Sequence, residues 1–508
     1  MGAESIDLLV IGGGINGVGI ARDAAGRGLR VVVVERSDLA SATSSASTKL
    51  IHGGLRYLES FEFRLVRESL EERERLLTIA PHIVRPMRFV LPHVQGLRPR
   101  WQIRLGLFFY DHIGARGKLP GSRGVRLAGR GHGEPLREQI THGFEYSDCA
   151  VDDSRLVVLN AIDAESRGAT VRTRAEFLSA RPINGRWLAD CRDTLSDQPL
   201  QFSARAIVNA AGPWVDRVLQ VFPGIRTQSR LRLVRGSHIV VPRLYDGSHA
   251  YLLQNPDRRV VFTIPYEGAF TLIGTTDIPC ESTSAPPEAS VGEIDYLCAT
   301  VNSYFRKTLT ARDVVWSYAG VRPLVDDEAA EVSKVTRDYR LELSAGQPAL
   351  LSVFGGKLTT YRRLAEAVLE RLHPFIGGTR QPWTDRAPLP GGDLPRGDFD
   401  SFVEYVKRRW DFLPPTLAPR LARAYGTRLE TILGAARNMA DLGEHFGAGL
   451  TAAELDYLVA SEWAVTAEDV LWRRTKLGLH MTDAQRANVE RHLDGRGSTA
   501  HSPAIART

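Results

Sequence analysis

The sequence predicts an α/β fold of the Rossmann type, interrupted by a β-rich insertion and followed by a helical C-terminal part. An apolar run at 6–11 leads into a glycine-rich turn and a helical segment, which is how a βαβ unit begins. Residues 231–276 hold short β-rich runs separated by turn residues. Beyond the Pro/Gly-rich segment 386–399, apolar residues recur with helical spacing. A chain of 508 residues exceeds what one core usually organises, so we expect two or three domains.

The composition is that of a globular protein, with 43% hydrophobic and 24% charged residues. No apolar run approaches the roughly 18 residues that a membrane-spanning helix needs, and the N-terminus lacks the basic start of a secretory signal. The cysteines have no CxxC spacing, which favours a reducing cytoplasm and predicts no metal site. The net charge of +6 forms no large basic stripe, so we expect no nucleic acid partner.

The glycine-rich turn has the spacing of a dinucleotide fingerprint. Gly12, Gly14 and Gly17 follow the first strand, and a second apolar run ends at Glu35. Glycines at this spacing let a pyrophosphate sit on the helix N-terminus, and the acid can accept hydrogen bonds from a ribose. The turn therefore predicts a bound dinucleotide.

The sequence favours FAD over NAD because later segments can hold a flavin. No second complete fingerprint is present, whereas 42–49, 206–215 and 354–362 each bring glycine, hydroxyl or lysine residues. In the last segment Gly355 and Gly356 precede Lys357 and a helix, an arrangement suited to a reduced, anionic flavin edge. The predicted cofactor-binding residues are Gly12, Gly14, Gly17, Glu35, Thr43, Ser44, Ser45, Lys49, Leu50, Gly53, Gly212, Gly356, Lys357, Leu358 and Thr359.

The segment 47–59, S-T-K-L-I-H-G-G-L-R-Y-L-E, concentrates groups suited to a second ligand. The glycine pair at 53–54 lets the backbone approach a flat ligand closely. Arg56 offers a planar guanidinium to an anionic substrate group. The segment therefore predicts a cofactor and a phosphate or carboxylate held side by side.

Together these residues resemble the FAD-dependent, quinone-linked glycerol-3-phosphate dehydrogenases of the aerobic bacterial type. The resemblance is carried by V-I-G-G-G-I-N-G, A-T-S-S-A-S-T-K-L-I-H-G-G-L-R-Y-L-E, G-F-E-Y-S-D-C, V-D-D-S-R-L, R-G-S-H-I-V-V-P, I-G-T-T-D, Y-A-G-V-R-P-L and S-V-F-G-G-K-L-T-T-Y-R, in this order. It implies a Rossmann-type FAD domain of the glycine and D-amino-acid oxidase kind, an inserted antiparallel-sheet substrate domain and an all-helical C-terminal domain.

This resemblance sets the expected domain boundaries. The FAD domain takes 1–95, 146–225 and 319–380, with a substrate- or membrane-facing segment at 96–145 and the substrate domain at 226–318. A linker at 386–400, a helical domain at 400–495 and a tail at 496–508 follow.

The resemblance implies oxidation of sn-glycerol 3-phosphate at C2 to dihydroxyacetone phosphate, with hydride transfer to flavin N5. It also implies a membrane quinone as electron acceptor, peripheral association with the inner face of the cytoplasmic membrane, and a homodimer. One sequence feature fits a membrane: 97–110 mixes arginines with Trp101, Phe108, Phe109 and other apolar residues. A buried helix with a solvated arginine face explains the same pattern equally well.

Particular residues fit this chemistry. Arg56 and Arg322 are the expected phosphate clamp, because guanidinium binds phosphate oxygens in a bidentate manner. Tyr57 can add a hydroxyl donor or pack against the cofactor. The base is His52 or His238, and the sequence does not choose between them. Expected neighbours of the same pocket are Thr276 and Asp277, and Lys357 is expected at the flavin edge.

Three other functions remain open at this stage. A soluble glycerol-3-phosphate oxidase using O2 shares the same pocket. A 2-hydroxy acid or amino acid oxidase shares the same fold. A non-catalytic FAD-binding scaffold needs only the cofactor site, although Lys357, Arg322, His52 and Arg56 argue against it.

Overall fold

The structure is a computed structural model that describes residues 3–58, 61–114, 117, 119–225, 227–283, 285–326, 338–344, 346 and 348–497. The side chains at 56, 396, 496 and 497 are outside this description, as is most of the expected tail at 496–508. The chain divides into two compact units. The first comprises 1–79 and 84–387, and the second comprises 80–83 and the chain from Pro388 onward, so the division falls inside the Pro/Gly-rich segment.

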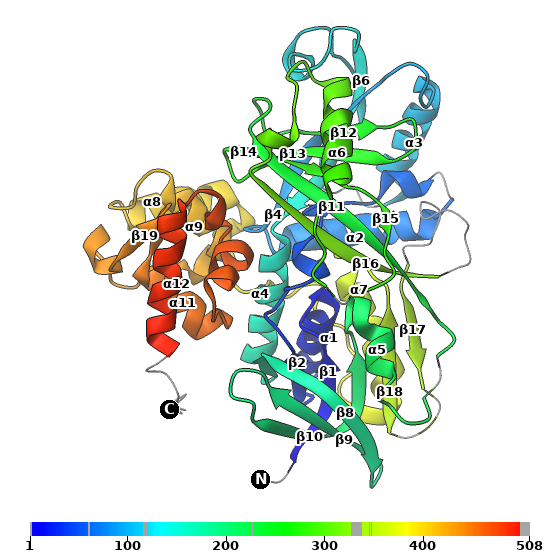
Figure 1. Ribbon diagram of the computed structural model, residues 1–508, viewed down its shortest axis with the longest axis vertical. Coiled ribbons are helices and arrows are strands. Elements are labelled where there is room, and N and C mark those ends of the chain that lie inside the picture. The colour runs from blue at the N-terminus through cyan, green and yellow to red at the C-terminus, as the bar shows by residue number, and fades with distance from the viewer. Residues whose placement is uncertain are drawn as a thin grey trace. The chain divides into compact units, whose positions relative to one another are not determined.

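The first sheet of unit 1 has a parallel centre in the order β18-β10-β1-β2-β7, extended by antiparallel β17 and by the β8–β9 hairpin (Figure 1). Its strands are β1 (Glu4–Ile11), β2 (Val31–Glu35), β7 (Thr170–Thr173), β8 (Ala175–Ile183), β9 (Arg186–Asp193), β10 (Pro199–Asn209), β17 (Arg340–Leu343) and β18 (Ala349–Phe354). Leu8 and Val10 of β1 pack on one face, whereas Leu9 and Ile11 pack on the other. This alternation follows from the two-residue period of a strand buried on both faces.

Helices complete a three-layer arrangement around this sheet. On one face α1 (Ile15–Gly26) packs between α4 (Asp153–Ser166) and α7 (Tyr361–Ile376). On the other face the core includes residues of β8, β9 and the short α5 (Val215–Leu219). The predicted Rossmann-type unit is thereby confirmed.

The second sheet runs in the order β15-β11-β14-β13-β12-β4-β6-β3, with β16 paired to β11 and β5 to β6. Its strands are β3 (Leu50–Ile51), β4 (Val84–Pro92), β5 (Arg123–Arg126), β6 (His142–Val151), β11 (Leu231–Pro242), β12 (Ala250–Gln254), β13 (Val260–Tyr266), β14 (Phe270–Gly274), β15 (Ile278–Pro279) and β16 (Trp316–Val325). All pairings are antiparallel except β12 with β4. The sheet thus draws on segments before residue 226 as well as on 226–318, since pairing joins strands that are distant in sequence.

Helices α2 (Phe63–Ile79), α3 (Arg100–Ile113) and α6 (Val291–Tyr304) accompany this second sheet (Figure 1). Helix α6 packs on β11 and β12 and contributes Leu297, Val301 and Tyr304 to their core. Helix α3 buries only Ile103, Leu107 and Tyr110, which lie three to four residues apart on one face. The opposite face of α3 is exposed.

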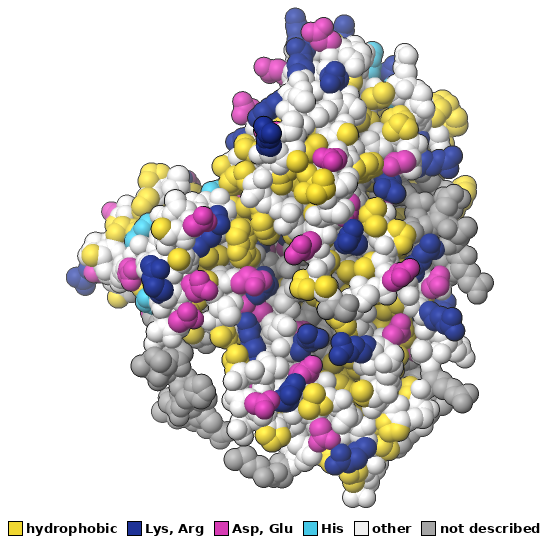
Figure 2. All heavy atoms as spheres, in the orientation of Figure 1, with side chains coloured by type: hydrophobic (Ala, Val, Ile, Leu, Met, Phe, Trp, Pro, Cys, Tyr) yellow, Lys and Arg dark blue, Asp and Glu magenta, His cyan; other side chains and the backbone are white. Residues whose placement is uncertain are grey.

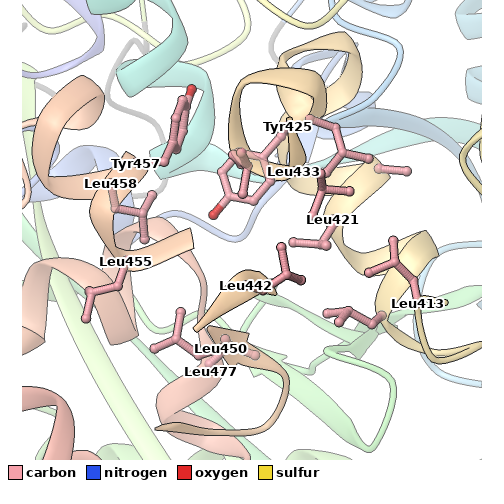
Figure 3. Packing of buried hydrophobic residues seen from close by; sticks show 14 of the residues in the cluster. Leu413, Leu421, Tyr425, Leu433, Leu442, Leu450, Leu455, Tyr457, Leu458 and Leu477 are labelled. Atoms are coloured by element: carbon pink, nitrogen blue, oxygen red, sulfur yellow. The ribbon is translucent and has the colours of Figure 1, made fainter. Parts of the chain in front are cut away.

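Unit 2 is mainly helical, as predicted. It contains α8 (Phe399–Arg409), α9 (Leu417–Tyr425), α10 (Leu429–Leu433), α11 (Ala452–Glu462), a π-helix (Asp469–Arg474) and α12 (Asp483–Gly497). Leucines from these helices and from the segments between them pack with Tyr425 and Tyr457 in a single core (Figure 3). The expectation of an all-helical domain missed the hairpin of β19 (His445–Gly447) and β20 (Leu450–Thr451), because strands this short leave no two-residue pattern.

Among the described residues, no helix has the length and apolarity needed to cross a membrane. The same residues contain no group of three or more His, Cys, Asp or Glu side chains that could hold a metal ion.

Candidate functional site

The glycine turn after β1 is a tight cradle at the N-terminus of α1. Gly12 has φ +113°, and a side-chain Cβ there would lie 2.6 Å from the carbonyl oxygen of Ala210. A Cβ on Gly17 would lie 1.9 Å from the carbonyl oxygen of Gly12. Only glycine fits both positions, so the helix N-terminus is open to an anion such as a pyrophosphate.

Glu35 lies at the end of β2 and holds this turn. Its carboxylate accepts hydrogen bonds from the backbone N–H of Gly13 at 2.7 Å and of Ser37 at 2.8 Å. Burial raises the pKa of Glu35, while these two donors oppose the rise. The remaining lone pairs of the carboxylate can accept from a ribose hydroxyl.

Distant segments converge on the same cradle. Ser44 Oγ accepts from the backbone N–H of Ile15 at 3.0 Å, and Thr43 Oγ1 donates to the carbonyl of Val321 at 2.6 Å. Gly12 lies against Ala210 and Ala211, directly before Gly212, which has φ +56°. The segment Gly355–Gly356 also meets the start of α1, through a hydrogen bond from Asn16 to Gly355.

Asn16 is a site residue that the sequence did not reveal. Its Nδ2 donates to the carbonyl of Gly355 at 3.2 Å, and a Cβ on Gly356 would lie 2.8 Å from that nitrogen. Its buried Oδ1 has no hydrogen-bond partner within the described part of the chain. A buried acceptor left open at a helix start is a further feature suited to a bound polar ligand.

Lys357 and Tyr57 bring segment 354–362 next to segment 47–59. The ammonium of Lys357 lies 3.9 Å from the centroid of the Tyr57 ring. Gly54 has φ +76°, and the Tyr57 ring occupies the space that a Cβ there would need, with a closest approach of 2.1 Å. The loop 52–57 therefore lies beside Lys357. Arg56 belongs to this loop, but its side chain is outside the described residues.

Strands β11 and β16 form a sheet face beside segment 43–49, here called the floor, with a pair of glycines at its centre. Gly236 pairs with Gly320, Val234 with Arg322, and His238 with Tyr318. Because side chains alternate along a strand, all six of these residues share one face. A Cβ on Gly236 would lie 2.3 Å from Arg322 Nη2, and one on Gly320 would lie 2.7 Å from Ala46 Cβ. The guanidinium thus lies over Gly236, and segment 43–49 packs against Gly320.

The Arg322 guanidinium is held by the segment 275–277. Nη2 donates to Thr275 Oγ1 at 2.8 Å, Nη1 donates to the carbonyl of Thr276 at 3.3 Å, and Nη1 also pairs with the Asp277 carboxylate. Three of the predicted substrate residues, Arg322, Thr276 and Asp277, therefore meet at one point.

Glu293 of α6 holds this segment from behind, and sequence reasoning did not identify it. Its carboxylate accepts from Thr276 Oγ1 at 2.7 Å, from Ser237 Oγ at 2.8 Å and from Arg235 Nη2 at 2.8 Å. Burial alone would raise the pKa of Glu293, but these hydrogen bonds and those from Ser290 lower it. The carboxylate is therefore a fixed acceptor beside β11.

His238 is buried within this floor. Its side chain is 1% exposed, stacks on Tyr318 with ring centroids 4.8 Å apart, and places Nε2 3.0 Å from Thr48 Oγ1. Burial, then the charges of Arg322 and Lys49, lower its pKa well below the usual value, so the imidazole is neutral. Its Nδ1 is buried and has no hydrogen-bond partner among the described residues.

His52 shares the same face of the sheet. It follows β3, is half-buried, and its ring centroid lies 6.5 Å from that of Phe262. Phe262 pairs with Gly274, and Gly274 pairs with His238, so these residues form one row across three strands. Both candidate bases therefore border the same floor, which the sequence alone did not establish.

Other predicted cofactor residues have structural partners. Lys49 Nζ pairs with the Asp153 carboxylate at 2.9 Å and donates to the carbonyl of Ser45 at 2.8 Å, which fixes the 43–49 segment. Ser45 Oγ donates to the carbonyl of Ala42 at 3.3 Å. Leu50 is buried opposite Ala150 in the second sheet. Of the residues after Lys357, Leu358 is half-buried and Thr359 is buried.

Two protein families match successive parts of this chain. Residues 7–362 match the FAD dependent oxidoreductase family, and residues 382–495 match the C-terminal domain of alpha-glycerophosphate oxidase. A glycerol-3-phosphate dehydrogenase of Pseudomonas aeruginosa is 56% identical over 97% of this chain and 95% of its own length. The chain belongs to the FAD-dependent glycerol-3-phosphate dehydrogenase family.

Other members of this family are similarly close. A D-erythritol 1-phosphate dehydrogenase of Brucella abortus is 52% identical over 95% of this chain and 97% of its own length. An aerobic glycerol-3-phosphate dehydrogenase of Escherichia coli is 50% identical over 96% of this chain and 97% of its own length.

Solved structures confirm the fold. A glycerol-3-phosphate dehydrogenase from Bacillus halodurans, complexed with FAD, has a TM-score of 0.74 and 28% identity and covers 99% of this chain and 97% of its own. Glycine oxidase from Geobacillus kaustophilus has a TM-score of 0.55 and 20% identity, covering 75% of this chain and 100% of its own. The predicted glycine-oxidase kind of fold is therefore correct.

FAD is the cofactor of this dehydrogenase family, and the cradle fits it. The glycine turn leaves room at the helix N-terminus where any Cβ would collide with backbone, and Asn16 leaves an acceptor open beside Gly355–Gly356. Four separated segments meet there, which is more than a nicotinamide dinucleotide needs from its first βαβ unit. The segments at 12–17, 43–45, 212 and 355–357 would hold it.

Proposed function

We propose that this protein oxidises sn-glycerol 3-phosphate at C2 to dihydroxyacetone phosphate and passes the electrons from FAD to a membrane quinone. The observation that carries the proposal is the floor of Gly236 and Gly320, with Arg322 held at one end and His238 and Tyr318 at the other. Because Gly236 and Gly320 have no side chains, the Arg322 guanidinium can lie over one glycine and segment 43–49 can pack against the other, so a positioned cation lies next to the predicted cofactor segment. Two similar proteins, of Pseudomonas aeruginosa and Escherichia coli, are glycerol-3-phosphate dehydrogenases by name, which supports the same substrate.

Arg322 is proposed to bind the substrate phosphate, together with Arg56. The guanidinium is positioned by Thr275 and by the carbonyl of Thr276 before any substrate arrives. Such pre-organisation reduces the entropy lost on binding, and the planar fork matches two phosphate oxygens. Arg56 belongs to loop 52–57, and its proposed role rests on the sequence because its side chain lies outside the described residues.

His52 is the proposed base for the C2 hydroxyl. His238 has Nε2 at Thr48 and a buried Nδ1, so its ring is integrated into the floor rather than presented to a ligand. His52 keeps partial exposure on the same face and lies next to the glycine pair at 53–54. A neutral imidazole in this position can accept the hydroxyl proton as the C2 hydrogen leaves.

Lys357 is proposed to stabilise negative charge at the cofactor edge. FAD, when bound, supplies the acceptor for the hydride from C2. The ammonium of Lys357 lies 3.9 Å from the centroid of the Tyr57 ring, in the segment that leads from Gly355 and Gly356 into α7. A fixed cation there favours the reduced, anionic cofactor over the oxidised one.

A longer polyol phosphate is the second candidate substrate. A relative named D-erythritol 1-phosphate dehydrogenase is 52% identical to this chain, which is close to the identity of the glycerol-3-phosphate dehydrogenases. The two substrates share the phosphate and a secondary hydroxyl. A panel of glycerol 3-phosphate, D-erythritol 1-phosphate and a 2-hydroxy acid, compared by kcat/KM, separates them.

The exposed face of α3 supports the membrane part of the proposal. Trp101, Phe108 and Phe109 of this helix are 68%, 50% and 41% exposed, and Phe61 and Phe63 extend them at 77% and 41%. The Phe63 and Phe109 ring centroids lie 6.3 Å apart, and those of Phe108 and Phe109 lie 6.0 Å apart. We call Phe61, Phe63, Trp101, Phe108 and Phe109 the aromatic surface. Hydrophobic side chains gather over this part of the molecule in Figure 2.

Charge around the aromatic surface fits anionic lipid. Arg100 and Arg104 are exposed on the same helix, and Arg64 and Arg67 are exposed on α2 beside it. Arg64 and Arg67 form ion pairs within the protein, which leaves Arg100 and Arg104 as the main contributors. A helix with aromatic residues on one side and arginines at its edges lies in the interface of an anionic bilayer.

An anaerobic titration with sn-glycerol 3-phosphate tests the central proposal. Bleaching of the oxidised flavin absorbance is expected, and a flavin that no polyol phosphate reduces would refute the substrate assignment and favour the non-catalytic scaffold. Re-oxidation then separates the acceptors. Rapid oxidation by a quinone analogue without hydrogen peroxide supports the quinone, whereas stoichiometric peroxide supports the oxidase. Light scattering of the purified protein tests the proposed homodimer.

Vesicle sedimentation tests the membrane proposal. The protein is expected to sediment with phosphatidylglycerol vesicles and much less with phosphatidylcholine vesicles. Replacing both Phe108 and Phe109 with Ser should abolish sedimentation while dye-linked oxidation continues. The matched control replaces Leu195, an apolar residue 64% exposed in a different part of unit 1, and should sediment normally. Sedimentation that ignores the Phe replacements would refute the assigned surface.

A further inference from the structure

Tyr110 of α3 reaches from that helix to the loop that carries His52. Its side chain is 3% exposed, and its hydroxyl accepts a hydrogen bond from the backbone N–H of Gly53 at 2.7 Å. The same hydroxyl donates to the carboxylate of Asp148 on β6, with both oxygens at 2.8 Å. Gly53 directly follows His52, so this contact is one peptide away from the proposed base.

The partners of Tyr110 are themselves fixed. Asp148 pairs with Arg73 of α2 at 2.8 Å, and these two side chains are 3% and 4% exposed. Arg73 also donates to the carbonyl of Ser147 at 3.0 Å. A buried carboxylate needs both a charge partner and a hydrogen-bond donor, and Arg73 and Tyr110 supply them. Removing one member therefore disturbs the others.

Residues 52–54 lie between two short elements. Strand β3 ends at Ile51 and a 3-10 helix begins at Leu55, so neither element supplies a hydrogen-bond partner for the N–H of Gly53. A Cβ on Gly53 would lie 2.5 Å from Leu70 Cδ2 and 2.7 Å from Tyr110 Oη, which shows how closely the backbone approaches both side chains. The buried N–H of Gly53 would lose its acceptor without the tyrosine hydroxyl.

A direct role of Tyr110 in proton transfer does not fit these contacts. Burial, and then the charge of Asp148, raise the pKa of Tyr110 well above its usual value, so the hydroxyl stays protonated. Its one proton goes to Asp148 and one lone pair goes to Gly53, and both contacts lie within the protein. What the hydroxyl can do is set where the peptide after His52 lies.

We infer that Tyr110, held by Asp148 and Arg73, is a positioning residue that places His52 over the substrate. This inference rests on the proposed role of His52 as base. The sequence did not reveal this role, since the pattern at 97–110 predicts either a membrane-facing helix or a buried helix with a solvated arginine face. The helix thus contributes to the site through the face opposite the aromatic surface.

The test is a double-mutant cycle on the full-length, FAD-loaded protein, with dye-linked oxidation of sn-glycerol 3-phosphate as the assay. Tyr110→Phe is expected to lower kcat by about 10- to 100-fold, the effect of misplacing a catalytic group by about 1 Å. FAD content and the KM should change much less. In a His52→Asn background, Tyr110→Phe should have no further effect on kcat, because its influence passes through His52.

The matched control is Tyr245→Phe. Tyr245 is also buried in unit 1, and its hydroxyl contacts the carbonyls of His249 and Thr263 at 2.9 and 3.0 Å, away from the His52 loop. It should lower the Tm comparably and leave kcat unchanged. Asp148→Asn, which keeps an oxygen for Tyr110, provides a second variant and should show a smaller loss of kcat.

The outcomes are separable. If Tyr110→Phe lowers only the Tm, or lowers kcat equally in both backgrounds, the positioning role is overturned. If His52→Asn retains full kcat, the proposed base is wrong, and that result is independent of how Tyr110→Phe behaves in the wild-type background.

Discussion

Replacing Gly236 with Ala should displace Arg322 and raise the KM for sn-glycerol 3-phosphate. The new Cβ would lie 2.3 Å from Arg322 Nη2 and 2.7 Å from Thr275 Oγ1. Since ordinary contact begins at about 3.5 Å, the guanidinium must move by roughly 1 Å. Both atoms are side-chain ends that can move, so the backbone of β11 should remain in place. The fold and the FAD site, built on the other sheet, should survive.

The magnitude follows from what Arg322 is proposed to hold. A hydrogen bond to a charged group contributes about 1.5–3 kcal/mol, and each 1.4 kcal/mol is about tenfold in affinity. Moving the guanidinium away from the phosphate should therefore raise the KM by about 10- to 100-fold. Steady-state kinetics with a dye acceptor measures the KM, and flavin absorbance per protein measures cofactor content.

The control is Gly124→Ala in β5, where no atom lies within 4 Å of the added Cβ and φ is not positive. It should leave both quantities unchanged. An unchanged KM in Gly236→Ala would refute the placement of the substrate on this floor. Parallel loss of FAD and substrate affinity would show that the change disrupts the fold instead.

Three further predictions follow from the same structure. Gly17→Ala should abolish FAD binding, because its Cβ would lie 1.9 Å from a backbone oxygen, and flavin absorbance measures the loss. The free energy of unfolding should decrease as the pH is lowered below about 6.5, by up to about 1.4 kcal/mol per pH unit, because His238 takes up its proton in the unfolded chain at a higher pH than in the folded one. Above that pH, His238 is neutral in both states and no longer lowers the free energy of unfolding. In urea titrations at pH 5 to 7, His238→Gln should reduce the dependence of the free energy of unfolding on pH; an equal pH dependence in both proteins would contradict this prediction. Glu293→Gln should raise the KM by about 3- to 10-fold at constant FAD content, as it weakens the acceptor for Thr276 and Ser237.

The sequence was sufficient for the fold and the cofactor cradle, because both depend on local patterns. The two-residue period of β1 and the spacing of Gly12, Gly14 and Gly17 constrain neighbouring residues along the chain. The helical C-terminal domain was predicted for the same reason, and its hairpin was missed because it is too short to show a period.

The candidate site depended on pairings that a single sequence does not encode. That Gly236 faces Gly320, and Val234 faces Arg322, is a matter of strand register between segments more than 80 residues apart. Glu293 and Asn16 carry no motif of their own. Asn16 lies inside the glycine fingerprint G-x-G-x-x-G, but the fingerprint specifies no residue type at that position.

Helix α3 separates the aromatic surface from the loop that carries His52. Its aromatic surface is on one side, and Tyr110 on the other side touches Gly53, so only the thickness of one helix, about 10 Å, separates the two. If that surface rests on lipid, the substrate loop lies within about one helix diameter of the headgroup region. Under the proposed function, this helix then sets the separation between a quinone at the headgroups and the substrate loop. Substitutions that thicken or tilt this helix should then change the rate of quinone reduction while leaving dye reduction intact.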